Sequence, residues 1–334
     1  MSAGPVLALD DVTVHLGGRR RWLRPSVPPV RAVDGVSLWI WAGEILGLVG
    51  ESGCGKTTLG RTVLGLQRET AGTIRLDGAV VSGKRPRDAR RARRAVQYVH
   101  QDPGAALDPW WSVGHTLAEG LAITGTGGKA ERVPKVEAAL AAVGLDPAAR
   151  RRYPHEFSGG QLRRIGLARI LLLDPRIVIL DEPTSGLDMS VQATILNLLL
   201  DIRAHRDLTY LFISHDLSVI RRLCDRVAVM YLGRLVELAP AAALFGRPLH
   251  PYTRALLAAA PRLEPGGLAT VPIRGEPPSA SRIPPGCRFA ARCPYVEPAC
   301  RAEDQVLADA ELGHAVACRR WSEIAAGAPP TAAA

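Results

Sequence analysis

Cysteine and long apolar runs are both scarce in this chain of 334 residues, which has only six cysteines. Its most apolar stretch, residues 170–180, is broken by Asp174, Pro175 and Arg176. A membrane-spanning helix needs about 20 mostly apolar residues, so the sequence predicts none. The N-terminus has neither a basic start nor a long apolar run, which predicts that no secretory signal is present.

Acidic residues are fewer than basic ones, and the formal net charge is +10. Such an excess favours acidic partners such as nucleotides, nucleic acid or an anionic lipid surface. Much of it lies in the run K-R-P-R-D-A-R-R-A-R-R at 84–94, which contains no aromatic residue. Because nucleic-acid patches usually combine basic with aromatic side chains, a solvated basic loop is favoured here.

Short apolar segments alternate with helical patterns between residues 6 and 240. Residues 177–180 and 210–214 are apolar, as in strands that are buried on both faces of a parallel sheet. Strands that alternate with helices predict an α/β fold. Beyond residue 240 the chain is Pro-rich with only short helical patterns, and residues 323–334 are predicted to be disordered.

The motif G-E-S-G-C-G-K-T-T at 50–58 follows an apolar strand and precedes a predicted helix, the context that a phosphate-binding loop requires. Its glycines allow backbone conformations in which consecutive N–H groups turn towards phosphate oxygens. Lys56 is expected to reach the β- and γ-phosphates of ATP, and Thr57 to bind Mg²⁺. The residues predicted to hold ATP are Gly50, Glu51, Ser52, Gly53, Cys54, Gly55, Lys56, Thr57 and Thr58, with the Cys54 side chain pointing away.

Two acidic residues, Asp181 and Glu182, follow the apolar strand R-I-V-I-L. Asp181 at the end of the strand is expected to hold Mg²⁺. Glu182 is expected to orient and deprotonate the water that attacks the γ-phosphate. An isolated D-E pair would more simply be a helix cap or a surface pair, but the phosphate loop makes the catalytic interpretation stronger.

A glycine-rich segment far from the phosphate loop points to a family. F-S-G-G-Q-L-R-R at 157–164 resembles the L-S-G-G-Q signature of ATP-binding cassette proteins, with Phe157 in place of Leu. The other motifs of that family occur in its order: the phosphate loop, Gln101 in Y-V-H-Q-D-P, the D-E strand, S-G-L-D at 185–188 and His215 in F-I-S-H-D. The resemblance implies a phosphate-loop (RecA-like) ATPase domain at 6–240 with antiparallel β and helical subdomains, and a small cysteine-containing extension at 241–322.

The same resemblance implies how two cassettes would share ATP. Ser158 and the N–H groups of Gly159 and Gly160 would face a γ-phosphate held by a second cassette, and ATP would close the head-to-tail pair. Gln101 would sense the γ-phosphate and Mg²⁺, and His215 would hold the water in position. The catalytic residues implied by the resemblance are Gln101, Glu182 and His215. Mg²⁺ would be held by Thr57, Gln101 and Asp181. Residues outside the phosphate loop that would also contact ATP are Gln101, Ser158, Gly159, Gly160, Gln161, Asp181 and Asp188.

Longer segments such as E-P-T-S-G-L-D-M-S-V-Q-A-T-I-L and L-H-P-Y-T-R-A-L-L are similar to ATP-binding subunits of dipeptide, oligopeptide and nickel importers, most of all to the second, F-type subunit of the pair. The resemblance implies a peripheral protein at the cytoplasmic face of the inner membrane. Its partners would be a second, non-identical ATPase subunit, two transmembrane permeases and, indirectly, an extracytoplasmic binding protein. Nickel or another small solute is the alternative cargo. A cassette ATPase without a transporter is the other alternative, although the chain lacks the second cassette or coiled-coil insertion typical of that class.

The sequence departs from the family pattern at a few positions. Leu16 stands where an aromatic residue often stacks on adenine, and Trp22 follows in a loop. His100 and Gly104 stand beside Gln101 where Phe and Tyr are common. The residue that contacts adenine therefore stays open.

Four of the six cysteines, Cys287, Cys293, Cys300 and Cys318, are gathered near the end of the chain with the spacing C-x5-C-x6-C-x17-C. A cytoplasmic setting disfavours disulfides, so the thiolates suggest zinc or an iron–sulfur cluster. The spacing lacks the C-x2-C pairs of structural zinc sites, and the resemblance favours a [4Fe–4S] cluster with a structural role. Zinc and reduced, unliganded thiols remain as alternatives. His314 is expected to lie on the surface nearby.

Overall fold

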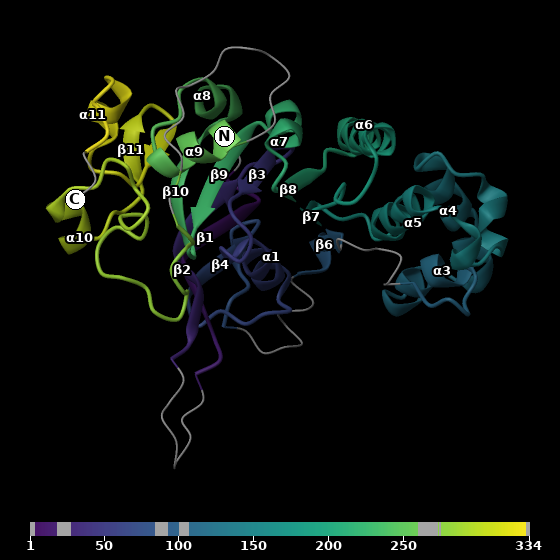
Figure 1. The fold of residues 1–334 in the computed structure, drawn as a ribbon. Helices are drawn as coiled ribbons and strands as arrows, with labels where there is room; N and C mark the ends of the chain where they lie inside the picture. The colour runs from purple at the N-terminus through teal and green to yellow at the C-terminus, as the bar shows by residue number, and fades with distance from the viewer. Residues whose placement is uncertain are drawn as a thin grey trace. The chain divides into compact units, whose positions relative to one another are not determined.

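The computed structural model describes residues 4–18, 28–83, 93–99, 107–259, 273 and 275–331 (Figure 1). The chain divides into two compact units. The first comprises Met1–Ile40, Glu44–Arg85 and Phe212–Ala334, and the second comprises Trp41–Gly43 and Pro86–Leu211. Strand β8 (Thr209–Ile213) has residues in both. Among the described residues, no helix has the length and apolarity needed to cross a membrane.

The first unit contains an antiparallel sheet in the order β2-β1-β4-β5. Its strands are β1 (Leu7–Leu16), β2 (Val30–Ile40), β4 (Ala71–Leu76) and β5 (Ala79–Val80). Leu7, Leu9, Val12 and Val14 of β1 are buried, which is the alternation expected of a strand with one face on the core.

A second sheet of the first unit has the order β11-β12-β10-β9-β3. Its strands are β3 (Ile45–Val49), β9 (Arg226–Tyr231), β10 (Arg234–Pro240), β11 (Ala308–Glu311) and β12 (His314–Val316). Strand β3 pairs with β9 in parallel, and β10 pairs with β9 and β12 antiparallel. The C-terminal extension thus supplies two strands to this sheet, where the sequence suggested only short helices.

The helices of the first unit are α1 (Lys56–Leu64), α7 (Leu217–Leu223), α8 (Ala241–Gly246), α9 (Pro251–Ala259), α10 (Pro298–Ala302) and α11 (Trp321–Ala325). Helix α11 begins within the extension and includes Glu323, where disorder was predicted to begin. The hydroxyl of Thr331 also donates to the carbonyl of Pro294 at 2.9 Å. The described part of the tail is therefore packed on the extension, because local polar contacts compensate for its apolar-poor composition.

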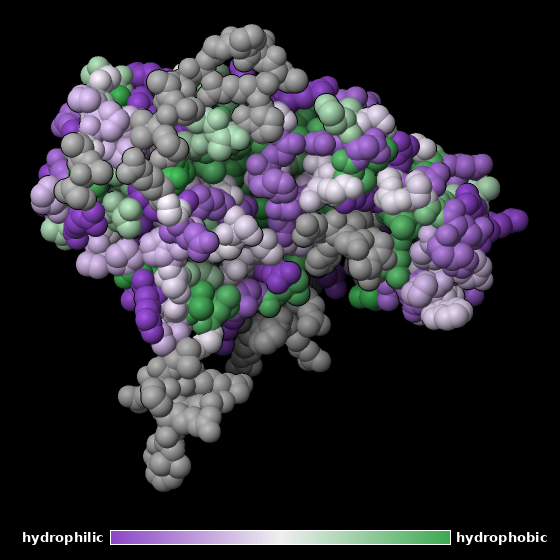
Figure 2. Space-filling model, in the orientation of Figure 1, coloured by the Kyte–Doolittle hydropathy of each residue, from purple (hydrophilic) through white to green (hydrophobic). Residues whose placement is uncertain are grey.

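The second unit contains α3 (Val113–Ile123), α4 (Lys129–Ala142), α5 (Gly159–Leu171) and α6 (Met189–Arg206), with the parallel strands β6 (Val96–Val99) and β7 (Ile177–Asp181). All five residues of β7 are buried, as its continuous apolar sequence predicted. Hydrophilic and hydrophobic residues are interspersed on the face of the molecule seen in Figure 2. The most exposed large apolar side chains of this unit are Trp110, Met189 and Ile123.

Candidate ATP site and cysteine pocket

The phosphate loop joins β3 to α1, as predicted. Gly50 and Gly55 have φ angles of 151° and 113°, which side-chain-bearing residues rarely adopt. A Cβ atom on Gly50 would lie 2.1 Å from the carbonyl oxygen of Met230, and one on Gly55 would lie 2.0 Å from that of Ala32. Both positions require glycine because the loop packs directly on the backbone of β9 and β2.

Lys56 is buried at the start of α1 although it carries a charge. Its Nζ donates to the carbonyl oxygens of Gly50 and Glu51 at 2.7 and 2.9 Å, which holds the ammonium group within the loop. Cys54 is also buried, and burial raises the pKa of its thiol. The Cys54 side chain is thus a small neutral filler beneath the loop, as the sequence suggested.

His215 lies at the end of β8 in the same unit as the loop. The N–H of Ser214, one residue before it, donates to the carbonyl of Leu48 in β3 at 3.3 Å. Because β3 leads directly into the loop, His215 is placed at the same end of these strands, and its side chain is exposed.

The carboxylate pair lies in the second unit, at the end of β7. Asp181 is buried and accepts a short hydrogen bond from the hydroxyl of Tyr98 in β6. Glu182 is half-buried and has a φ angle of +51°, a strained conformation for a residue with a side chain. Tyr98 was not identified from the sequence, because nothing local links β6 to Asp181.

The signature segment begins α5 in the second unit. The Ser158 hydroxyl accepts from the N–H of Gln161, and the Gln161 amide oxygen accepts from the N–H of Ser158 at 3.0 Å. Such a capping box orders the helix N-terminus, while Ser158 and Gly159 remain exposed. Arg163, one turn further on, donates to the carbonyls of Pro183 and Ser185 and so joins this helix to the loop after β7.

Asp188 ends the S-G-L-D motif and caps α6 by accepting from the N–H groups of Ser190 and Val191. The bond from Val191 is the main cause that lowers the pKa of the Asp188 carboxyl. The predicted ATP site thus has members in both units, with the loop and His215 in the first and Asp181, Glu182, Ser158 and Asp188 in the second. Gln101, Trp22, His100, Gly104 and most of the basic run lie outside the described residues.

The four cysteines of the extension line one pocket, together with His250 and Phe289. All four are free thiols. Burial raises the pKa of Cys293 and of Cys318 to about 12, and it also raises the pKa of Cys287. In the described part of the chain, no three His, Cys, Asp or Glu side chains are arranged so that they could hold one metal ion. The sequence thus correctly grouped the four thiols, but they do not form a compact single-ion site.

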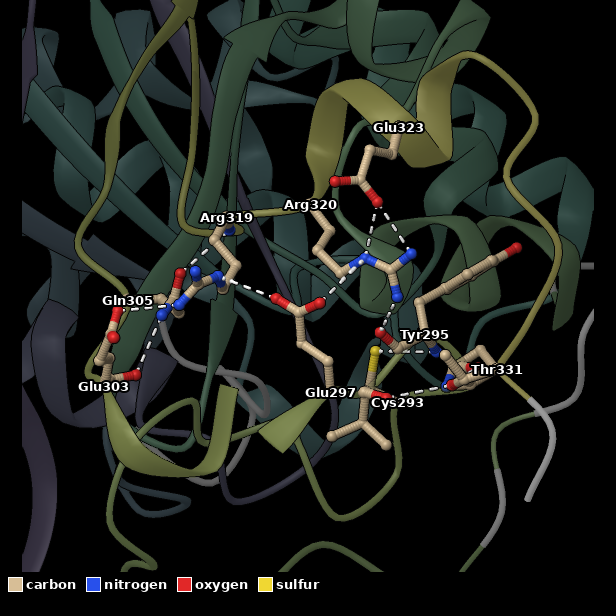
Figure 3. Close-up of polar contacts among 11 residues, drawn as sticks. Cys293, Tyr295, Glu297, Glu303, Gln305, Arg319, Arg320, Glu323 and Thr331 are labelled. Carbon is tan, nitrogen blue, oxygen red and sulfur yellow. Dashed lines mark hydrogen bonds and ion pairs between the residues drawn. The ribbon is translucent and has the colours of Figure 1, made fainter. Parts of the chain in front are cut away.

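Arginine–carboxylate pairs surround the cysteine pocket (Figure 3). Arg320 bridges Glu323 at 2.8 Å and donates to the carbonyl of Tyr295 at 2.9 Å. Arg319 bridges Glu297 at 3.0 Å and Glu303 at 2.8 Å. Because these contacts join the segment after Cys318 to segments between the cysteines, they hold the small extension together where little apolar core is available.

Glu237 of β10 is fully buried and ties the extension to the sheet. It accepts from the N–H groups of Leu249 and His250 at 2.7 and 3.0 Å, and its Oε1 lies 2.7 Å from Nε2 of His314. The expected surface position of His314 is therefore wrong: its side chain is buried in β12 because Glu237 provides the polar partner that burial requires.

Two side chains from the C-terminal part of the chain contact the phosphate loop. Arg292 Nη1 and Nη2 bind Glu51 Oε2 and Oε1 at 2.8 and 3.0 Å. The N–H of Glu51 donates to the hydroxyl of Tyr252 in α9 at 2.8 Å. The sequence contained no signal for either contact, because Arg292 and Glu51 are 241 positions apart.

Comparison with known proteins accounts for both regions. Residues 33–185 match the model of the ABC transporter family, and residues 236–300 match that of the oligopeptide/dipeptide transporter C-terminal region. A peptide import ATP-binding protein of Brucella ovis is 47% identical over 321 residues, which cover 96% of this chain and 99% of that protein. The chain belongs to the ABC transporter family, as an ATP-binding subunit.

Two further relatives extend this assignment. The oligopeptide transport ATP-binding protein AppF of Bacillus subtilis is 44% identical and covers 95% of this chain and 98% of that protein. The solved structure of cbiO1 from Clostridium perfringens, part of an ABC transporter complex, has a TM-score of 0.63 and 26% identity over 73% of this chain and 91% of that chain. The predicted α/β ATPase fold is confirmed, and this ABC subunit is an ATPase that binds ATP.

Proposed function

We propose that this ABC subunit hydrolyses ATP to drive the import of dipeptides or oligopeptides through a membrane permease. The single observation that carries the proposal is the likeness to peptide import ATP-binding proteins over nearly the whole chain, including the extension. Nickel or another small solute is the second candidate cargo, because the permeases and the binding protein, not this chain, contact the solute.

The proposed chemistry divides the site residues by role. Lys56 and the N–H groups of the loop other than that of Glu51 bind the phosphates, and Thr57, Gln101 and Asp181 would hold Mg²⁺, which neutralises phosphate charge. Glu182 takes the proton of the attacking water. His215 holds Glu182 and the water in position.

Two cassettes are required in this proposal. The exposed Ser158 and Gly159 and the half-buried Gly160 face the γ-phosphate on the partner, with Gln161 and Asp188 beside them. ATP binding closes the pair, and hydrolysis opens it. We assign residues 6–240 to the cassette and 241–322 to the extension. The complex has a second, non-identical ATPase subunit and two permeases, with this chain peripheral at the cytoplasmic face of the inner membrane.

The cysteine pocket is proposed to hold a [4Fe–4S] cluster. Four thiolates from Cys287, Cys293, Cys300 and Cys318 are the usual ligand set for such a cluster, and all four line the same pocket. The positive charge of the iron would stabilise the buried thiolates. The cluster would also stabilise the fold of an extension that has little apolar core.

The importer proposal is tested by co-expression of this chain with the permease and partner ATPase encoded with it. We expect the chain to co-purify with both permeases from the membrane fraction, and di- or tripeptide uptake by reconstituted vesicles to require ATP. A chain with Glu182→Gln should co-purify equally well but support no uptake. If the chain stays out of the membrane fraction in the presence of the permeases, the transport assignment is wrong.

A further inference from the structure

Glu51 of the phosphate loop is held from outside the loop at both its side chain and its backbone. Arg292 grips the carboxylate with two hydrogen bonds, and the Tyr252 hydroxyl accepts from the Glu51 N–H. The direction of the Glu51 N–H is therefore set by its hydrogen bond to the Tyr252 hydroxyl. The first turn of the loop is therefore fixed by residues that are more than 200 positions away in the sequence.

The Arg292–Glu51 pair is stronger than an ordinary surface ion pair. The Arg292 side chain is only 9% exposed and that of Glu51 26%. Two parallel N–H···O bonds add geometric specificity to the charge attraction. Arg292 also lies against the Tyr231 ring, with its guanidinium carbon 5.9 Å from the ring centroid, and Tyr231 packs on Tyr252. These contacts leave the guanidinium little freedom.

Arg292 and Tyr252 adjoin residues that line the cysteine pocket. Arg292 directly precedes Cys293, which lines the pocket. The Tyr252 ring packs on Phe289, with centroids 5.5 Å apart, and Phe289 lines the pocket as well. A shift of the pocket wall would therefore be transmitted to Glu51 through both contacts.

A second cysteine has an equivalent neighbour. Arg288 directly follows Cys287 and binds Asp34 in β2 and the carbonyl of Leu232. The next residue, Gly233, donates its N–H to the carbonyl of Cys54 in the phosphate loop at 2.8 Å. Cys293 and Cys287 are thus each followed or preceded in the sequence by an arginine that is linked to the loop. Arg292 binds Glu51 of the loop directly. Arg288 binds the carbonyl of Leu232, and the neighbouring Gly233 contacts the loop.

We propose that Arg292 and Tyr252 are positioning residues of the phosphate loop, and that through them the state of the cysteine pocket sets the affinity for ATP. This inference rests on the proposed role of the loop in ATP binding. A well-ordered pocket holds Glu51 and keeps the loop in one conformation, so ATP does not have to order it. A disordered pocket releases Glu51 and weakens ATP binding without removing any group that contacts the phosphates.

The test measures the dissociation constant of a non-hydrolysable ATP analogue with the full-length chain and Mg²⁺. We expect Arg292→Gln and Glu51→Gln each to weaken binding about 10-fold, which corresponds to about 1.4 kcal/mol. The double variant should be no weaker than either single variant, because both remove the same contact. Tyr252→Phe should weaken binding by a smaller factor, about 3-fold, as expected for loss of one neutral hydrogen bond.

Arg247→Gln is the matched control, since Arg247 forms an exposed ion pair with Glu311 at 2.8 Å and is not part of the pocket lining. It should leave ATP affinity unchanged. Equal loss of affinity in Arg247→Gln and Arg292→Gln would overturn the proposal, as would an Arg292→Gln variant that binds the analogue like the unmodified chain.

The pocket itself is tested in two backgrounds. Cys293→Ser and Cys300→Ser should each weaken analogue binding in the unmodified chain, and neither should weaken it further in Arg292→Gln. Equal effects in both backgrounds would mean that the pocket does not act through Arg292. If the extension of these variants fails to fold, the Arg292→Gln and Glu51→Gln cycle decides alone.

Failure of the underlying ATP-site assignment gives a different result. If the unmodified chain does not bind the analogue, or if Lys56→Ala binds it equally well, the loop is not the ATP site. If Lys56→Ala abolishes binding while Arg292→Gln leaves it unchanged, the ATP site stands and the coupling is rejected.

Discussion

The phosphate loop and the cysteine pocket are both binding regions of the first unit, yet they are built in opposite ways. The loop motif consists of nine consecutive residues that follow β3, and the last three of them begin α1. The pocket is lined by cysteines from four places along the extension and by His250 and Phe289 from separate segments. The loop therefore depends on local backbone conformation, whereas the pocket depends on the path of the chain. The conformation of the loop also depends on the extension, because Arg292 and Tyr252 of the extension both contact Glu51 of the loop.

The largest effect is expected from Glu182→Gln, which tests the chemistry of the ATP site independently of the pocket. Removing a general base typically lowers turnover about 10²–10⁴-fold. ATP binding should be retained, and the closed pair of cassettes should accumulate because hydrolysis no longer opens it. ATPase rate and size-exclusion chromatography with ATP would measure both effects. Glu119→Gln, at a surface pair with Arg169, is the control; normal hydrolysis by Glu182→Gln would show that another group is the base.

A second large effect is expected from Lys56→Ala, which removes the ammonium group that contacts the loop backbone at residues 50 and 51. ATP affinity should fall about 100-fold, because a charge-assisted contact to the phosphates is lost. Lys135→Ala, on the exposed side of α4, should bind ATP normally. Equilibrium titration with a fluorescent ATP analogue gives both values, and a Lys56→Ala variant with normal affinity would contradict the loop's assignment.

The pocket is examined by metal analysis of the anaerobically purified chain. We expect about four irons per chain and a broad absorption band, as four-cysteine ligation of one cluster predicts. Cys293→Ser should lose the iron and should melt several degrees lower, since about 1 kcal/mol shifts the melting temperature of a domain of this size by about 2–4 °C. Cys224→Ser, whose cysteine lies outside the pocket, should retain the iron. One zinc per chain would show that the cysteines bind zinc instead of a cluster. A chain that contains no metal would contradict the cluster proposal.

The smallest expected effect is a change of the free energy of unfolding with pH that comes from His250 in the cysteine pocket. Burial lowers the pKa of His250 to about 4, partly offset by the Glu237 carboxylate. An unfolded histidine has a pKa of about 6.5, so the unfolded chain binds the proton first as the pH falls. The free energy of unfolding should therefore decrease between about pH 6.5 and pH 4, where the unfolded state holds more protons.

His250→Gln should show a shallower decrease of melting temperature over this range, while the exposed His205→Gln should not change the slope. Identical slopes in His250→Gln and the unmodified chain would show that other groups govern acid stability. ATP affinity of the unmodified chain measured over the same range would show whether the pocket and the loop weaken together.

Much of the ATP site followed from the sequence because its determinants are local. The apolar runs before Gly50 and Asp181 predicted buried strands, and the glycines predicted a loop that only glycine can form. The positions of the loop, α1, β7 and the capped helix after Ser158 agree with the expectation. The conformational strain at Glu182 was not visible, because Glu itself does not favour a positive φ angle.

Contacts between distant segments could not be read in this way. The hydroxyl of Tyr98 reaches Asp181, His314 is buried against Glu237, and the extension adds β11 and β12 to the sheet of β10. Each of these partners is polar or short, so neither periodicity nor composition marks it as part of the core. The spacing of the cysteines suggested a common site, but not which other side chains would close it.

The sequence by itself determined that this chain has a phosphate loop, a carboxylate strand and a signature helix, because each depends on residues that are adjacent along the backbone. Tertiary structure alone decided that His250 and Phe289 line the cysteine pocket and that Arg292 binds Glu51 from 241 positions away. Such contacts form when the folded sheet brings separate segments together, and hydrogen-bond geometry then selects the pair. The link between pocket and loop is therefore a property of the fold rather than of either motif.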